Sequence, residues 1–85
     1  MRLSLKYFAS LREALGPGGE LDWTPAGAPT AAALRAWLCT QSGTHAQALA
    51  PGRAVRVAID QVLADEATPL RDGAEVAFFP PVTGG

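Results

Sequence analysis

The chain has 85 residues and a mass of 8.8 kDa, and 48% of its residues are hydrophobic while 18% are charged. This length accommodates one hydrophobic core and excludes a second, and the composition is too apolar for a disordered chain. The formal net charge of -1 leaves no basic excess for neutralising phosphates, which excludes a nucleic-acid partner, and no apolar run approaches the ~20 residues of a membrane helix.

The first residues of the chain and its single cysteine indicate a cytoplasmic protein. One cysteine excludes an internal disulfide, and no basic segment followed by a long apolar stretch predicts a signal peptide. A domain of this size rarely encloses a ligand pocket of ~300 Å³ or more while keeping a core. The chain is therefore not expected to be an enzyme on its own.

The first half of the chain predicts two strands around a short helix. Apolar residues alternate with polar ones from Leu3 to Tyr7, as in a half-buried strand. A short helix over 9–15 follows and ends at the glycine-rich turn 16–19. A second strand over 20–24 then pairs antiparallel with the first.

The second half predicts the main helix and three further strands. Thr30 is the expected N-cap of a helix over 30–41, which Gly43 stops. Strands are expected at 55–59, 62–64 and 75–79, the last lying parallel to the first in a mixed sheet. The prediction is an α+β fold with one main helix on one sheet face, a domain over 1–79 and a flexible tail over 80–85.

The side chains offer little catalytic chemistry. The glycine-rich turn lacks the Lys-Ser/Thr pair of a phosphate loop, and one Cys with one His cannot form a zinc site. Cys39 is interpreted as a half-buried helical residue and His45 as a surface loop residue. Three acids are interpreted as solvated turn residues: Asp60, Asp65 and Glu66. We expect no metal, nucleotide or other cofactor to bind the isolated chain.

The end of the chain is its most informative element. Gly84 and Gly85 have no side chains, so this segment fits a narrow channel and leaves the terminal carboxylate open. Adenylation by ATP would convert that carboxylate to an acyl-adenylate that sulfur can attack. The six residues from Pro80 reach up to ~20 Å when extended. The alternative is an inert end that happens to be Gly-Gly.

Two aromatic residues are predicted beside the root of this tail. On the last strand Val76 and Phe78 share one face, whereas Phe79 has the opposite parity. On the first strand Phe8 continues the polar face. If these strands are parallel neighbours, Phe8 and Phe79 lie at the same end of the outer sheet face, where an exposed aromatic patch indicates a partner site.

Several segments resemble the small subunits of molybdopterin synthase, a family of ubiquitin-related sulfur carriers. The opening Tyr-Phe-Ala-Ser-Leu-Arg-Glu at 7–13, followed by Gly16, is similar to theirs, as are Leu34-Arg35 and Asp72-Gly73. The ending Glu-Val-Ala-Phe-Phe-Pro-Pro-Val-Thr-Gly-Gly at 75–85 is the most specific match. The resemblance covers the whole chain and implies a ubiquitin-like β-grasp fold.

The resemblance also implies a chemistry and partners. An E1-like activating enzyme would adenylate Gly85 with ATP, and a sulfur donor system would convert it to a thiocarboxylate. The tail would then enter the large catalytic subunit, in a 2:2 heterotetramer, and donate sulfur to cyclic pyranopterin monophosphate to make molybdopterin. The resemblance assigns Gly84 to this reactive end and the following residues to partner contact: Phe8, Arg12, Leu63, Phe79, Pro80, Pro81, Val82 and Thr83.

One departure and three alternatives accompany this assignment. Asp60 stands where the family usually has Asn in a turn, which questions the hydrogen bonding of that turn. The alternatives are a sulfur carrier for thiamine, cysteine or tRNA thiolation, a ubiquitin-like modifier, and a binding module with an inert tail. The Phe-Phe-Pro-Pro-Val ending argues against the first, and Lys6, the only lysine, argues against chains of a modifier.

Overall fold

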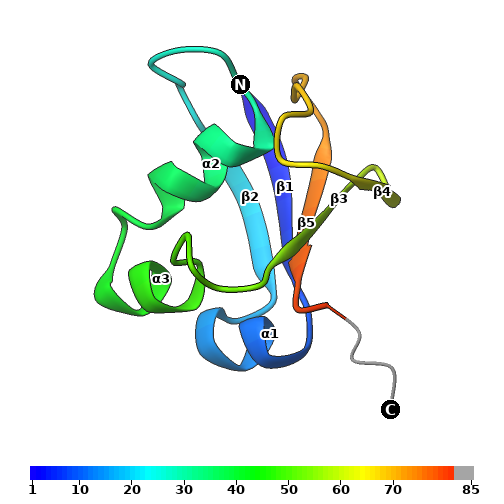
Figure 1. Cartoon of the computed structure of the whole chain (residues 1–85). Coiled ribbons are helices and arrows are strands. Elements are labelled where there is room, and N and C mark those ends of the chain that lie inside the picture. Colours follow the sequence, from blue (N-terminus) through cyan, green and yellow to red (C-terminus); the bar gives the residue numbers. More distant parts are fainter. Residues whose placement is uncertain (82–85) are drawn as a thin grey trace.

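A computed structural model describes residues 1–81 of the chain (Figure 1). One five-stranded sheet has the order β2-β1-β5-β3-β4. Figure 1 shows α2 and α3 on one side of this sheet, with α1 near the end of β1. The elements in chain order are β1 (Arg2–Tyr7), α1 (Ala9–Leu15), β2 (Gly18–Asp22), α2 (Ala31–Leu38), α3 (Gly43–Ala48), β3 (Arg56–Ile59), β4 (Val62–Ala64) and β5 (Glu75–Phe79).

The two strands farthest apart in the sequence form the centre of the sheet. β1 pairs parallel with β5, with Tyr7 opposite Phe78, as predicted. The other neighbours, β1 with β2, β5 with β3 and β3 with β4, are antiparallel. The sheet is therefore mixed, and the C-terminal end of β5 lies beside the C-terminal end of β1.

The core lies between the sheet and the apolar side of α2. Leu34 and Leu38 of α2 are buried in the same cluster as Leu3, Val76 and Phe78 of the two central strands. The Thr30 hydroxyl oxygen accepts a hydrogen bond from the Ala33 N–H at 3.1 Å, so the predicted N-cap is confirmed. Burial of these side chains from both layers holds the inner face of the sheet in place.

The main helix is shorter than predicted, and Gly43 does not end it. The N–H groups of Thr40 and Gln41 donate to carbonyls three residues back, so the helix tightens into turns after Leu38. Ser42 then caps a separate short helix, α3, by accepting from the His45 N–H. Gly43 is the first residue of α3.

β2 begins earlier than the predicted strand over 20–24. Gly18 and Gly19 already pair with Lys6 and Leu5 of β1. A Cβ atom on Gly18 would lie 2.2 Å from the Leu5 carbonyl oxygen, and its φ is +104°. Glycine has a low strand propensity, but here the absence of a side chain permits the close approach to β1. The strand therefore extends into the glycine-rich turn.

Candidate functional site

β5 ends where two prolines follow Phe79. Proline has no N–H to continue the ladder, so the chain leaves the sheet at Pro80. Because β5 lies between β1 and β3, this exit is at the middle of the sheet and not at its edge (Figure 1). Pro80 and Pro81 are half-buried. The predicted reactive residues Gly84 and Gly85, with Val82 and Thr83, lie outside the described residues.

A row of paired residues with two alanines at its centre crosses the outer face of the sheet beside this exit. Lys6 is paired with Ala77, Ala77 with Ala58, and Ala58 with Leu63, across four neighbouring strands. The two alanines leave a hollow of about 480 Å³, which we call the outer groove. Its lining residues are Lys6, Phe8, Ala9, Ala58, Gln61, Glu75, Ala77, Phe79 and Pro80.

Phe8 and Phe79 both line the outer groove, as their parity predicts. Phe8 is 45% exposed and Phe79 is half-buried, whereas Phe78 is completely buried on the inner face. The Phe8 N–H donates to the Phe78 carbonyl at 3.2 Å, which fixes the end of β1 against β5. Ala9, with φ of +54°, then turns the chain into α1. The structure thus brings the two predicted aromatic residues together at the root of the tail.

Leu63 and Arg12 flank the outer groove on opposite sides. Leu63 is 64% exposed on the edge strand β4, next to Ala58 in the row of paired residues. Arg12 is exposed on α1 and borders a second hollow, which also has Phe8 in its wall. The resemblance grouped these residues, and the structure connects them to the outer groove through Ala58, which pairs with Leu63, and through Phe8, which lines both hollows.

One ion pair borders the apolar part of this surface. Lys6 Nζ lies 3.1 Å from Glu75 Oε1, and both residues line the outer groove. Lys6 and Glu75 neutralise each other, so the groove presents little net charge. The Glu75 side chain is 23% exposed and that of Lys6 is 46% exposed, which leaves the ammonium accessible to water.

Both carboxylate oxygens of Asp60 accept hydrogen bonds in the turn between β3 and β4. Asp60 and Gln61 have φ values of +51° and +67°, as a two-residue type I′ hairpin turn requires. Asp60 Oδ1 accepts from the Glu75 N–H at 3.0 Å, and Oδ2 accepts from Arg71 at 2.7 Å. The backbone bond from Glu75, and then Arg71, lower the pKa of Asp60 below its ordinary value. The departure from the usual Asn therefore adds an ion pair and leaves the turn intact.

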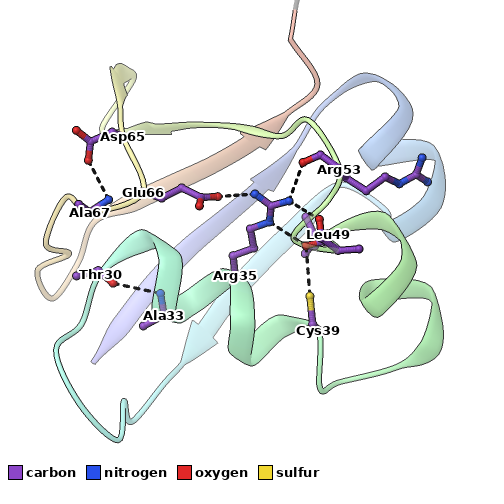
Figure 2. Close-up of polar contacts among 10 residues, drawn as sticks. Thr30, Ala33, Arg35, Cys39, Leu49, Arg53, Asp65, Glu66 and Ala67 are labelled. Carbon is purple, nitrogen blue, oxygen red and sulfur yellow. Dashed lines mark hydrogen bonds and ion pairs between the residues drawn. The ribbon is translucent and has the colours of Figure 1, made fainter.

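The interpretation of Glu66 as a solvated acid is incomplete, because its side chain is 42% exposed but also forms an ion pair. Glu66 is half-buried, and its Oε1 lies 2.5 Å from Arg35 Nη1. Arg35 also donates to the carbonyls of Leu49, Ala50 and Arg53, so one guanidinium joins α2 to the segment after α3 (Figure 2). A buried guanidinium requires a negative partner, and sequence spacing gave no sign of which acid would supply it. Asp65 is exposed, and its Oδ1 accepts a hydrogen bond from the Ala67 N–H. Asp60 is exposed but forms an ion pair with Arg71.

Cys39 and His45 have structural roles. The Cys39 thiol lies 3.4 Å from the Leu49 carbonyl oxygen and is half-buried, as predicted. His45 lies on α3 and not in a loop, and it is half-buried rather than at the surface. Its Nδ1 is 2.7 Å from the Ser42 hydroxyl, whose oxygen caps the helix. Within residues 1–81, no three His, Cys, Asp or Glu side chains gather as a metal site would need.

None of the helices in the described part of the chain combines the length and the apolar character that crossing a membrane requires. These residues support binding of another molecule, because the outer groove is largely apolar. The polar side chains of Arg35, Glu66 and Asp60 are bound to other residues of the same chain.

Sequence comparisons place the chain in a known family. The sequence pattern of the ThiS family matches residues 5–85. The chain belongs to the ThiS family. It is 42% identical to the "Molybdopterin synthase sulfur carrier subunit" of Escherichia coli over 83 residues, 98% of this chain and 99% of that protein. A Haemophilus influenzae protein of the same name is 38% identical over 86 residues, with the same coverage.

A solved structure similar to this ThiS-family chain is that of SAMP1 from Haloferax volcanii. Its TM-score is 0.77 and its identity 24%, with 100% of both chains covered. This likeness, together with the mixed five-stranded sheet and its parallel β1–β5 pair, confirms the predicted ubiquitin-like β-grasp fold.

Six of the nine residues that line the outer groove were not among the predicted site residues: Lys6, Ala9, Ala58, Gln61, Glu75 and Ala77. Ala58 and Ala77 are paired on neighbouring strands, and Gln61 is exposed in the hairpin turn. The two alanines have the outward parity on their strands, and small residues at paired outward positions are a signal that would have located the hollow. Gln61 had no signal of its own, because its position depends on the hairpin turn.

Proposed function

We propose that this chain is a sulfur carrier of molybdenum cofactor biosynthesis and the small, non-catalytic subunit of a molybdopterin synthase. It would act in the cytoplasm, where the lone thiol of Cys39 stays reduced. The names of two full-length relatives at 42% and 38% identity support this role. The observation that carries the proposal is the apolar outer groove, which lies where the chain leaves the sheet toward Gly85.

The reactive group in this proposal is the main-chain carboxylate of Gly85. One carboxylate oxygen attacks the α-phosphate of ATP in an activating enzyme, and pyrophosphate leaves. The terminal sulfur of a donor-protein persulfide attacks the acyl-adenylate carbon, and AMP leaves with the oxygen; a thiol then attacks the donor sulfur of the acyl disulfide, so that the S–S bond breaks and a new disulfide forms on the donor. The resulting thiocarboxylate carries sulfur without releasing sulfide. Transfer to cyclic pyranopterin monophosphate and hydrolysis then restore the Gly85 carboxylate.

The outer groove would dock the large synthase subunit, with which the chain would form a 2:2 heterotetramer. Phe8 and Phe79 present aromatic area beside the tail, and partly exposed aromatics are the residues that most often anchor an interface. Leu63 and Arg12 extend this surface on either side. The chain must leave after each transfer, so a modest interface suits the task.

Intact-mass spectrometry tests the sulfur-carrier proposal. The purified chain is incubated with ATP, an E1-like activating enzyme and a sulfur donor. We expect a mass gain that corresponds to replacement of one carboxylate oxygen by sulfur, located by fragmentation at Gly85. A chain lacking Gly85 should gain nothing, whereas Cys39→Ala should react like the wild type. An unchanged wild-type mass would contradict the proposal and favour a binding module with an inert tail.

A second reaction separates the proposed pathway from the alternatives. The thiocarboxylated chain is mixed with the large synthase subunit and the pterin precursor, and molybdopterin is measured. Formation of molybdopterin assigns the chain to this pathway. A thiocarboxylate that forms but never reaches the pterin would assign it to thiamine, cysteine or tRNA thiolation. Isopeptide products on other proteins would indicate a modifier.

A further inference from the structure

Backbone conformations that disfavour side chains gather at the outer groove. Within residues 1–81, three non-glycine residues have positive φ: Ala9, Asp60 and Gln61. Ala9 and Gln61 line the groove, and Asp60 is the neighbour of Gln61. A residue with a Cβ atom is destabilised in this region, and such residues concentrate at binding sites.

The fold accounts for Asp60 but not for Gln61. Asp60 holds the turn through its N–H, which donates to the Glu75 carbonyl, and through its carboxylate, which accepts from Glu75 and Arg71. None of these contacts involves Gln61. Glycine is the residue that a type I′ turn most favours after Asp, and it would release the unfavourable φ of +67°. A glutamine here serves something other than the hairpin.

The Gln61 side chain supplies what the groove otherwise lacks. The groove walls at Phe8 and Phe79 are apolar, and the charges of Lys6 and Glu75 are paired with each other. Gln61 is exposed, and its amide offers both a donor and an acceptor. A primary amide complements the N–H and C=O of a peptide group, so the matching chemistry is the main chain of a protein partner.

We propose that Gln61 is a specificity-determining contact residue that hydrogen-bonds the main chain of the large subunit docked in the outer groove. This inference rests on the proposed function, which assigns the groove to that subunit. Gln61 would therefore lower the stability of the folded chain through its φ of +67° while raising the affinity for the large subunit.

The test measures unfolding and affinity for the large synthase subunit in the same variants. Gln61→Gly should be at least as stable as the wild type, yet bind about five- to tenfold more weakly through loss of the amide contact. Gln61→Ala should show the same loss of affinity without the gain in stability. Gln47→Ala is the matched control, since it removes an exposed glutamine amide from α3, outside the outer groove, and it should bind normally.

Three outcomes would overturn the inference. Normal binding by Gln61→Gly and Gln61→Ala would show that the amide makes no contact. A loss of affinity in Gln61→Gly but not in Gln61→Ala would show that added backbone freedom, and not the missing amide, weakens binding, and an equal loss in Gln47→Ala would show that the effect is not specific to the groove. Phe79→Ala in the same assay separates this from the proposed docking site: if it also binds normally, the groove itself is not the docking surface.

Discussion

Adjacent phenylalanines on β5 should respond oppositely to truncation. Phe78 is completely buried and stacks on Tyr7 with 6.4 Å between ring centroids, so Phe78→Ala removes a core ring and leaves a cavity. Such truncations cost ~3–5 kcal/mol of unfolding free energy. A domain of this size has a total stability of ~4–13 kcal/mol, so this variant loses much of it. Phe78→Leu, which keeps most of the volume, should cost less than ~2 kcal/mol and serves as a folded comparison.

Phe79→Ala should mainly affect binding. Phe79 is half-buried on the outer face, so its truncation should cost about 1 kcal/mol of stability from lost apolar burial. Loss of an aromatic anchor should weaken binding of the large subunit by roughly 2 kcal/mol or more. Phe8→Ala should behave similarly, and the double variant should be non-additive because both rings line one groove.

Urea unfolding and calorimetric titration with the large subunit measure both quantities in each variant. If Phe79→Ala lowers the unfolding free energy as much as Phe78→Ala, the assignment of strand faces to core and partner is refuted. If Phe79→Ala and Phe8→Ala both bind normally, the outer groove is not the docking surface.

Three polar groups give further predictions. The Tyr7 hydroxyl is buried without a hydrogen-bond partner among the described residues, so Tyr7→Phe should be neutral or stabilising in urea unfolding. Burial raises the pKa of Tyr7 to about 12, so between pH 10 and 12 the Tyr7 hydroxyl ionises in the unfolded chain but not in the folded one. The unfolding free energy of the wild type should therefore fall by up to about 3 kcal/mol over this range. Tyr7→Phe should not show this fall. The pKa of Asp60 is lowered in the folded chain, so the ionised carboxylate stabilises the fold above its ordinary pKa of 3.8. This stabilisation disappears as the pH falls through the lower native pKa. The difference in unfolding free energy between the wild type and Asp60→Asn should therefore shrink over that acidic range. Arg35→Met should cost ~3–5 kcal/mol in unfolding experiments because it strands a carboxylate and three carbonyls, whereas Glu66→Gln should cost far less because Glu66 is 42% exposed and its amide oxygen still accepts.

The first strand was predictable because its residues alternate in burial. Leu3, Leu5 and Tyr7 are buried as their period-two pattern indicates, and the opposite parities of Phe78 and Phe79 gave their faces directly. The parallel pairing of β1 with β5 followed from covering one face with one helix. These features depend on local sequence and on elementary packing.

Other features depend on contacts between distant segments. The pairing of Arg35 with Glu66 joins residues 31 positions apart, and no local pattern identifies it. The hollow over Ala58 and Ala77 exists only because two strands align these alanines side by side. The left-handed Gln61 follows from a two-residue turn whose length is set by the register of β3 with β4.

In the proposed function, the transferred sulfur resides on the main chain at Gly85. The direct measurement follows isotopically labelled sulfur placed in a Gly85 thiocarboxylate, with the chain mixed with the large subunit and cyclic pyranopterin monophosphate. We expect the label to appear in the molybdopterin formed and the chain to return to its carboxylate mass. Molybdopterin that forms without the label, while the label stays on the chain, would contradict the proposed function.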